Sequence, residues 1–421
     1  MRATLDHSSE IGREEAPPFG RLVSRAGNRR LVLVASMHLA VDAVIGSIAV
    51  VLPAIQGRFG LTAAGSGGLL ATFSVAALVT QPAAGRASDR FGAARAATVG
   101  ALIATGLLST LAIAPRLWLA YVVVILGGLG ASAFHPAALL MAEVGTGSDR
   151  SVAITVFSTA GMLGLTIGPI AASMLTSAGG PKAMVLMLLP AALLSRPMWR
   201  AGRSHVERRA SQVPPLREVL NSQLVMLTVA GTLAALAATT FLAVVPSWTA
   251  GHAGSRSSLA VGMAVAAFQF GGAIGMAAGA VAGRRWALER FVPSSLLGGM
   301  GAFVGMVAIG PGVPVAYLLG ALGGALSASS VPAQIVAAQT AIPQSPAAAT
   351  GMVMGFANGT AGLLFLPLAA ALSDHGSGLL LLVGFGALVP AAVLMSRVLR
   401  TPVGPTAIRR PICGCGAAWP T

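Results

Sequence analysis

The segment Gly85–Arg95, with the sequence GRASDRFGAAR, is a short charged turn between two long apolar segments. Each neighbouring segment is long enough to cross the hydrocarbon core of a bilayer, which takes about twenty residues of helix. Three arginines and an aspartate are too costly to place in hydrocarbon, so we expect this turn at the membrane surface. Because arginine and lysine concentrate on the cytoplasmic side of membrane proteins, the turn is predicted to face the cytoplasm.

The composition also indicates a membrane protein. Of the 421 residues, 55% are hydrophobic and only 9% are charged, and the mean hydropathy is +0.81. In a soluble chain the net charge of +15 would suggest a nucleic-acid-binding protein. Here the basic residues lie in the gaps between apolar segments, and no basic stripe alternates with aromatic residues. The charge is therefore attributed to orientation in the lipid bilayer, and no nucleic-acid partner is expected.

Apolar runs separated by helix breakers predict an all-α membrane protein with twelve transmembrane helices. The predicted spans are 31–55, 64–84, 96–114, 117–141, 151–176, 183–199, 222–248, 257–282, 292–310, 314–340, 347–372 and 378–399. The polar interval 200–221 is predicted to be a cytoplasmic central loop between two six-helix bundles, residues 31–199 and 222–399. Residues 1–30 and 400–421 are predicted to be cytoplasmic tails.

The basic residues set the predicted orientation in the plasma (inner) membrane. With both termini in the cytoplasm, 23 of the 27 lysines and arginines face the cytoplasm and 4 face outward. One missed or additional span would destroy this separation. The distribution is the positive-inside pattern that a multi-pass membrane protein follows.

Short features recur between the two bundles. Val51–Pro53 matches Val244–Pro246, His135–Ala137 matches Val331–Ala333, and Gly164 and Pro169 match Gly362 and Pro367. The offsets are 193, 196 and 198 residues, nearly constant along the chain. Parallel six-helix repeats with a substrate site at their interface are a recognised plan of secondary transporters. The fold class predicted is therefore two parallel repeats of six helices. The protein is expected to function as a monomer.

The spacing Gly-x-x-x-Asp-Arg-x-Gly-x-x-Arg in this turn resembles the loop between the second and third spans of the major facilitator superfamily. The resemblance implies that Asp89 meets the N-terminal end of the eleventh helix, whose dipole favours an anion, and locks the outward-facing state. Arg90 and Arg95 would be its local partners, and Gly85 and Gly92 would complete this gating loop. The alternative is a solvated turn that only sets the topology.

Ionisable side chains inside spans are costly and mark transport pathways or proton relays. The clear cases are His38 and Asp42, four residues apart on one face of the first span, and His135 in the fourth. Because histidine titrates near neutral pH, we interpret these residues as proton-coupling candidates. The alternative for His38 and Asp42 is a structural hydrogen bond. His135 directly precedes Pro136 and has the alternative of satisfying a backbone carbonyl that the proline frees.

Uncharged polar and small residues are the candidates for a central substrate cavity. They are Ser158, Gly161, Gln269, Gln334 and Asn358. The glycines also have the simpler role of letting helices approach closely.

Several motifs together are similar to the fosmidomycin-resistance transporters. Ser36–Asp42 resembles that family's His-x-x-x-Asp opening, and Phe134–Pro136 its Phe-His-Pro; Phe157–Pro169 and Val331–Ile335 resemble later signatures. The resemblance covers all twelve predicted spans and implies a proton-driven antiporter that exports drugs. Ala137 stands where that family has a polar residue, and no arginine or lysine is buried to pair with a phosphonate. A dianionic substrate is therefore not expected.

The leading interpretation is an antiporter that exports a small drug-like or amphipathic compound in exchange for protons by alternating access. The alternative is an uptake symporter or metabolite exporter of the same fold, for a sugar or an organic acid. An enzyme is not expected, because the three buried ionisable residues lack a neighbouring nucleophile motif. No metal or cofactor is expected either: Cys413 and Cys415 stand without a second ligand pair, and no phosphate-binding lysine loop is present.

Overall fold

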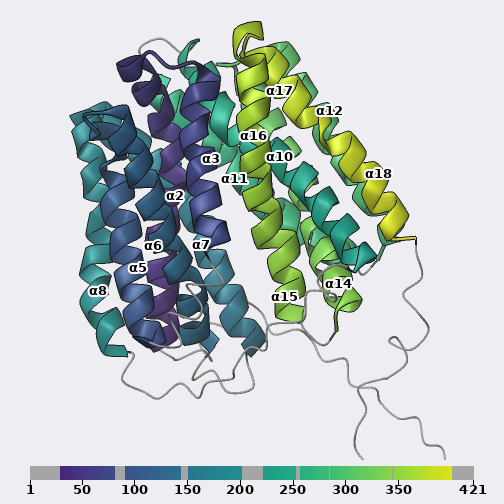
Figure 1. The fold of residues 1–421 in the computed structure, drawn as a ribbon, viewed down its shortest axis with the longest axis horizontal. Helices are drawn as coiled ribbons and strands as arrows, with labels where there is room; N and C mark the ends of the chain where they lie inside the picture. The colour runs from purple at the N-terminus through teal and green to yellow at the C-terminus, as the bar shows by residue number, and fades with distance from the viewer. Residues whose placement is uncertain are drawn as a thin grey trace, which may run out of the picture.

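The computed structural model describes residues 29–80, 91–143, 150–201, 221–252, 257–283, 285–343 and 346–400, and they are predominantly helical. In the first half, the elements are α2 (Arg29–Phe59), α3 (Ala63–Val79), α5 (Ala93–Ser109), the 3-10 turn η1 (Leu111–Ile113), α6 (Leu117–Glu143), α7 (Arg150–Gly179), the 3-10 segment η2 (Pro181–Leu188) and α8 (Leu189–Ala201). The two halves form two neighbouring groups of helices (Figure 1).

In the second half, the elements are α10 (Ser222–Ala250), α11 (Ser257–Ala282), α12 (Leu288–Ile309), α13 (Pro314–Ala328), α14 (Val331–Ala341), α15 (Pro346–Gly351), the π-helical turn η4 (Met352–Phe356), α16 (Ala357–Leu372), the 3-10 turn η5 (Ser373–His375), α17 (Ser377–Gly386) and α18 (Leu388–Val398). The all-helical membrane architecture predicted from the sequence is confirmed.

Within the described residues, 10 helical segments are long and apolar enough to cross a membrane. The remaining predicted spans, 64–84 and 183–199, fall on shorter elements. Helix α3 has 17 residues and ends before residues 81–84, which lie outside the described part of the chain. The other span is divided between η2 and the 13-residue α8. The count of twelve therefore stays a prediction.

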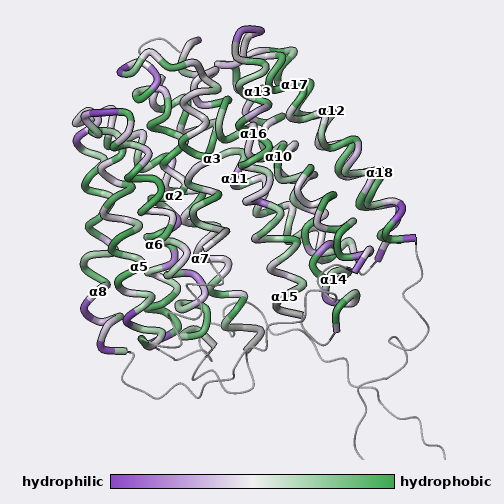
Figure 2. Tube along the Cα trace, in the orientation of Figure 1, coloured by the Kyte–Doolittle hydropathy of each residue, from purple (hydrophilic) through white to green (hydrophobic). Residues whose placement is uncertain are grey.

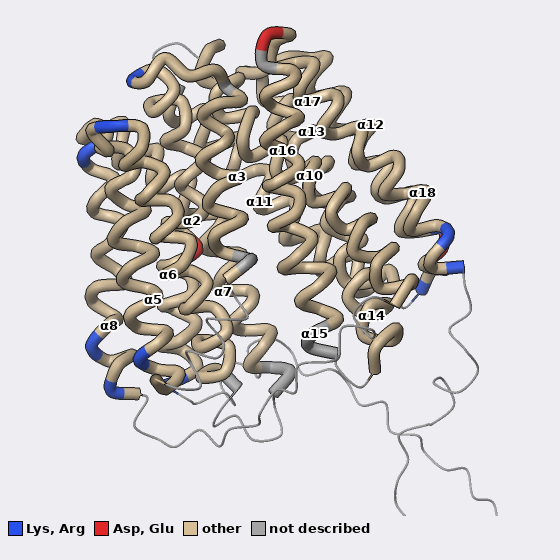
Figure 3. Tube along the Cα trace, viewed as in Figure 1, with Lys and Arg blue, Asp and Glu red and all other residues tan. Residues whose placement is uncertain are grey.

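The helix surfaces suit a lipid environment. Large apolar side chains are exposed along many helices, as Leu193 on α8 and Leu318 on α13 show, with exposed fractions of 77% and 68%. Figure 2 shows hydrophobic colouring through the middle of both helix groups. In Figure 3 the charged residues gather toward the helix ends. Asp42 is the exception among the described residues, because it lies near the middle of α2 and is buried.

Helices α2 and α7 pack backbone against backbone through a glycine stripe on α7. Gly161, Gly164 and Gly168 lie on the face of α7 that meets α2. A Cβ atom on Gly164 would overlap the carbonyl of Leu39, and one on Gly168 would overlap the carbonyl of Ala43. Lipid gives no hydrophobic driving force for helix association, so such close van der Waals contact is what holds membrane helices together.

Gly168→Ala is therefore expected to lower stability by about 3 kcal/mol, the upper end of the usual cost of overpacking. The obstruction is the backbone of Ala43, which cannot rotate away as a side chain can. The melting temperature of the purified protein in detergent measures the effect. Gly301→Ala in α12 is the matched control, because a Cβ atom at that position would meet nothing within 4 Å. Equal melting temperatures for the two variants would contradict this packing.

The helices of the two halves pair in the same way when they are matched in chain order. In the first half α2 contacts α7 and α8, α6 contacts α3 and α5, and α5 contacts α8. In the second half α10 contacts α16 and α18, α13 contacts α11 and α12, and α12 contacts α18. Each of these pairs in one half thus has a counterpart in the other.

The hydroxyl contacts between the halves lie at one end of the helices. Ser66, near the start of α3, lies 3.4 Å from Ser247, near the end of α10, between their Oγ atoms. Thr176 Oγ1, near the end of α7, lies 2.8 Å from Ser258 Oγ at the start of α11. Both pairs lie at the end where α2 finishes, opposite the end where α2 begins. The two halves are therefore joined at that end.

Candidate functional site

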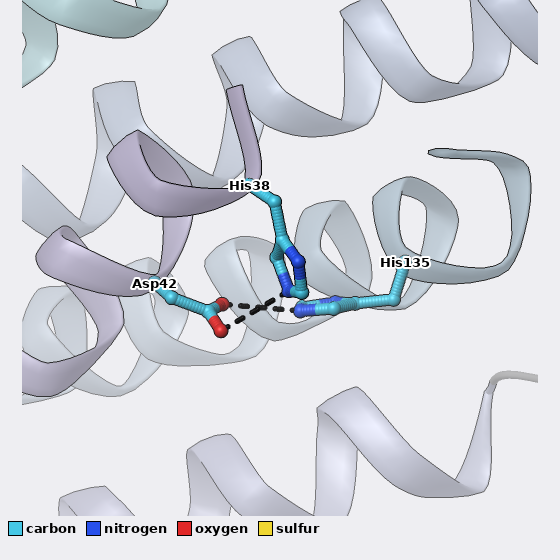
Figure 4. A group of neighbouring side chains, drawn as sticks. All are labelled: His38, Asp42 and His135. Carbon is cyan, nitrogen blue, oxygen red and sulfur yellow. Dashed lines mark hydrogen bonds and ion pairs between the residues drawn. The ribbon is translucent and has the colours of Figure 1, made fainter. Parts of the chain in front are cut away.

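Three ionisable side chains from two helices converge on one carboxylate. His38 and Asp42 are one turn apart on α2, and His135 comes from α6. His38 Nε2 lies 3.2 Å from Asp42 Oδ2, and His135 Nε2 lies 3.1 Å from Asp42 Oδ1. Figure 4 shows both imidazole rings directed at the same carboxylate, one at each oxygen. We call these three residues the His–Asp–His cluster.

The opposite nitrogen of each ring is held by a backbone carbonyl. His38 Nδ1 is 2.8 Å from the carbonyl oxygen of Phe157 on α7, and His135 Nδ1 is 2.7 Å from that of Ala131 on α6. A carbonyl oxygen only accepts hydrogen bonds, so each Nδ1 must carry the hydrogen and donate it. In both histidines, therefore, Nε2 is the nitrogen whose protonation can change.

The cluster is buried to different depths. The side chains of His38 and Asp42 are 8% and 10% exposed, whereas that of His135 is 30% exposed. The ring of Phe157 stacks on His38 at a centroid distance of 3.8 Å, and the ring of Phe134 lies 5.8 Å away. Aromatic rings thus screen His38, while His135 forms the accessible side of the cluster.

Room for the cluster depends on the absence of a side chain at Gly161 on α7. A Cβ there would lie 2.5 Å from His38 Cε1 and 2.7 Å from both His38 Nε2 and Asp42 Oδ2. Nε2 and Oδ2 are the atoms that form the hydrogen-bonded contact. The glycine predicted to line a substrate cavity therefore lies against the cluster itself.

Gly161→Ala is expected to separate His38 from Asp42 and to reduce transport more than stability. The neighbours of the new methyl group are side-chain atoms that can move, unlike the backbone beside Gly168. Transport rate per folded molecule and melting temperature should be measured on the same preparation. A variant that loses stability but transports normally per folded molecule would show that Gly161 serves packing alone.

Two imidazoles and one carboxylate are also a donor set that transition metals accept, and their donor atoms lie within 4.8 Å of one another. The nitrogen–oxygen distances of 3.1 and 3.2 Å are hydrogen-bond lengths, so a proton between each pair accounts for the arrangement. The expectation that the chain holds no metal stays a prediction.

The other predicted cavity residues do not converge on the cluster in the way that Gly161 does. Gln334 is buried and donates to Ser330 Oγ in its own helix turn at 2.8 Å. Asn358 is exposed on α16 and donates to the carbonyl of Met354. Ser158 on α7 is exposed, and Gln269 on α11 is half-buried. Their role in a substrate cavity stays a prediction.

A cavity of about 350 Å³ lies at the joined end of the halves. Its lining includes Val50, Pro53, Thr176 and Ser258, and none of the predicted cavity residues takes part. This cavity is therefore separate from both the cluster and the predicted cavity residues.

The gating loop is only partly within the described residues. Gly85, Asp89 and Arg90 lie outside them, so the predicted contact of Asp89 with the eleventh helix stays a prediction. Gly92 has a φ of +90° and precedes the first residue of α5, a conformation that glycine adopts readily. Arg95 lies over the ring of Trp199 on α8, 5.8 Å from its centroid. The sequence pattern does not predict this aromatic partner.

Two further features of the cluster are missed by sequence reasoning. The carbonyls of Phe157 and Ala131 hold the imidazoles, and no side-chain pattern identifies a backbone acceptor. The stacking of Phe157 on His38 joins residues 119 positions apart. In the sequence, Phe157 stands out only as the first residue of a motif.

Comparisons with known proteins agree with the fold. A family model described as Major Facilitator Superfamily matches residues 34–367. A segment of 158 residues is 28% identical to the fosmidomycin resistance protein of Escherichia coli, covering 38% of this chain and 39% of that protein. A segment of 126 residues is 33% identical to multidrug resistance protein 2 of Bacillus subtilis, covering 30% and 32%. The matched segments thus span about two fifths or less of these relatives.

Solved transporter structures share the fold at low sequence identity. The nucleoside transporter NupG superposes with a TM-score of 0.70 at 13% identity, covering 89% of this chain and 100% of NupG. A bacterial homologue of the human lysosomal transporter Spinster, in an inward-facing and occupied conformation, gives 0.68 at 14% identity, covering 92% and 98%. At such identities the likeness concerns the fold alone.

Proposed function

Because the chain belongs to the Major Facilitator Superfamily, and is accordingly a membrane transporter, we propose that it is a proton-coupled antiporter. It exports a small drug-like or amphipathic compound by alternating access. The observation that carries this proposal is the His–Asp–His cluster. A buried carboxylate near the middle of a spanning helix is expensive to keep, and such groups serve ion pathways and proton relays.

The cluster has the parts that proton exchange requires. It has a carboxylate, two imidazoles, and an accessible side at His135. It also connects three helices, because His38 and Asp42 belong to α2, His135 to α6, and the carbonyl that holds His38 to α7. A change of protonation therefore changes contacts between helices, which is what coupling to a conformational change needs.

The curated relatives favour export of a drug. Their names refer to resistance against fosmidomycin and against multiple drugs, and resistance is the phenotype that efflux produces. The superfamily match together with transporter-like structures supports a transport role over an enzymatic one.

We further propose twelve spans in two parallel six-helix repeats, with both termini in the cytoplasm of the plasma membrane and one copy as the working unit. The matched helix pairings of the two halves support the repeat. Following the helices in chain order, the described basic residues divide unequally between the two ends. The end where α2 begins has Arg29, Arg30, Arg95, Arg150, Arg196, Arg200, Arg285, Arg290, Arg397 and Arg400, against Arg58, Arg116 and Lys182 at the other. Positive charge favours the cytoplasmic side, so the first end faces inward.

With this orientation, the end at which the halves are joined through Thr176 and Ser258 faces outward. The conformation is then closed to the outside, and access to the cluster comes from the cytoplasm. The Spinster homologue of similar fold was itself solved in an inward-facing conformation. Exchange of protons and substrate would require these contacts to open.

Drug susceptibility of an efflux-deficient bacterial host that expresses the chain tests the proposal. Increased resistance to a subset of a broad panel is expected, with loss of that resistance when an ionophore collapses the proton gradient. An empty-vector strain is the control, and membrane fractions must show that the chain is expressed. Absence of resistance across the panel, combined with uptake of radiolabelled sugars or organic acids, would instead support a symporter of the same fold.

A further inference from the structure

We propose that the His–Asp–His cluster binds two protons, and that releasing both changes its net charge from +1 to −1. This inference deepens the proposed function and rests on it, because it gives the number of protons exchanged at the same site. It follows from hydrogen-bond accounting around Asp42, His38 and His135.

Each of the two contacts at Asp42 needs its own hydrogen. The Nδ1 atoms of both histidines already donate to backbone carbonyls, so a neutral His38 or His135 presents a bare lone pair at Nε2. An ionised carboxylate presents only lone pairs as well. Two such atoms facing each other in a buried site repel, and each would lack a donor. A proton between Nε2 and oxygen converts either contact into a charge-assisted hydrogen bond.

Counting protons then distinguishes three states of the cluster. Without a proton, the carboxylate alone gives a charge of −1 and both contacts are repulsive. With one proton the cluster is neutral, and one contact is bonded while the other is repulsive. With two protons the charge is +1 and both contacts are bonded. The observed distances of 3.2 and 3.1 Å at the two carboxylate oxygens fit this last state.

Charges from neighbouring helices do not replace either proton. The described parts of α3, α10 and α11, which pack against α2, carry no Asp, Glu, Lys, Arg or His inside their helices. On the other neighbours such residues lie toward the helix ends: Arg95 on α5, Glu143 on α6, Arg150 on α7, Lys182 in η2, and Arg196 and Arg200 on α8. Tyr121 on α6 is also near an end, beside Gly68. Among the ionisable side chains that the structure describes, those in contact with the carboxylate are the two imidazoles.

Release of the two protons has a mechanical consequence. Each step breaks one N–H bond of an imidazolium, or the equivalent O–H bond of the carboxylic acid, and passes the proton to water at the exposed side of His135. Once both are gone, α6 loses its hydrogen bond to Asp42 and is repelled instead. Exchanging two protons per substrate molecule also raises the concentration ratio that export can maintain. For a neutral substrate and a gradient of one pH unit, the ratio is about 100-fold with two protons and about tenfold with one.

Nuclear magnetic resonance of the purified protein, labelled with ¹⁵N at histidine, tests the proton positions. Spectra are recorded in nanodiscs with EDTA across the pH range in which the protein stays folded, and His38→Gln and His135→Gln assign the signals. At low pH both histidines should carry hydrogens on both nitrogens or share the Nε2 hydrogen with Asp42. At high pH both should be neutral with the hydrogen on Nδ1. A neutral His38 or His135 with its hydrogen on Nε2 would overturn the inference.

A potentiometric difference titration counts the protons directly. The wild type is compared with His38→Gln/Asp42→Asn/His135→Gln over the same pH range, with size-exclusion profiles confirming that both are folded. The expected difference is two protons per chain, and a difference of one or none contradicts the inference. If the triple variant does not fold, the wild type is compared with Asp42→Asn instead. Spectra of Asp42→Asn, recorded as above, then show whether each histidine still changes its protonation in that variant.

The outcome is separable from that of the proposed function, because neither measurement involves transport. A count of one, together with resistance that depends on the proton gradient and on Asp42, would keep the antiporter and remove the second proton. A count of two, together with resistance that is independent of Asp42, would keep the two-proton site and remove its role in export.

Discussion

Asp42→Asn is expected to abolish proton-driven export and to return drug susceptibility to that of the empty-vector control. The amide has nearly the shape of the carboxylate, so the contact with Gly161 is preserved and the variant should fold. The amide nitrogen can donate a hydrogen bond to one imidazole Nε2, but the neutral amide does not bind or release a proton. The amide oxygen can accept a hydrogen bond from the other imidazole only if that histidine is protonated. The cluster therefore loses the group around which its protonation is organised.

Export of a compound identified in the susceptibility panel measures this effect in inverted membrane vesicles with an imposed pH gradient. Asp374→Asn is the matched control, because Asp374 lies in the exposed turn η5 and should leave export unchanged. Melting temperatures of the two purified variants show whether folding differs. Export that proceeds at the wild-type rate in Asp42→Asn would exclude Asp42 as the proton site.

A disulfide between positions 176 and 258 is expected to stop transport completely. The Oγ atoms of Thr176 and Ser258 are 2.8 Å apart, so two cysteines at these positions would place their sulfur atoms close enough to bond at about 2.05 Å. The bond would join α7 of the first half to α11 of the second at the proposed outer end. Alternating access needs that end to open, and a covalent link prevents it.

The variant Thr176→Cys/Ser258→Cys is made in a background with Cys413→Ser and Cys415→Ser, so that no other thiol reacts. Oxidation should eliminate transport, and reduction should restore it. Each single cysteine variant controls for substitution alone, and a maleimide shift on a gel gives the cross-linked fraction. Transport by fully cross-linked protein would contradict alternating access at this end. Failure to form the disulfide would contradict the closed outer conformation.

The architecture was largely predictable because its cause is local. A continuous apolar segment must form a helix in lipid, since each backbone polar group needs a partner within the segment. The structure places a helical element on every predicted span. The predicted spans that do not coincide with a membrane-length helical segment among the described residues are 64–84 and 183–199.

The candidate site was predictable only in its parts. His38 and Asp42 share a helix, and the four-residue spacing places them on one face. His135 is 93 residues from Asp42, and nothing in the spacing shows that both imidazoles reach the same carboxylate. From the sequence alone, His135 has an equally good interpretation as a partner for a carbonyl near Pro136. Its ring in fact does both, since Nδ1 meets the carbonyl of Ala131 while Nε2 meets Asp42.

The sequence by itself thus determined that this chain is a helical membrane protein, and it singled out the three costly ionisable residues within the spans. Hydropathy and charge act residue by residue, so they can be read along the chain. Only the tertiary structure decided that the three side chains share one carboxylate, that backbone carbonyls hold both Nδ1 atoms, and that Gly161 leaves room for them. Those relations depend on how α2, α6 and α7 pack, and helix packing in lipid arises from close contacts between distant residues.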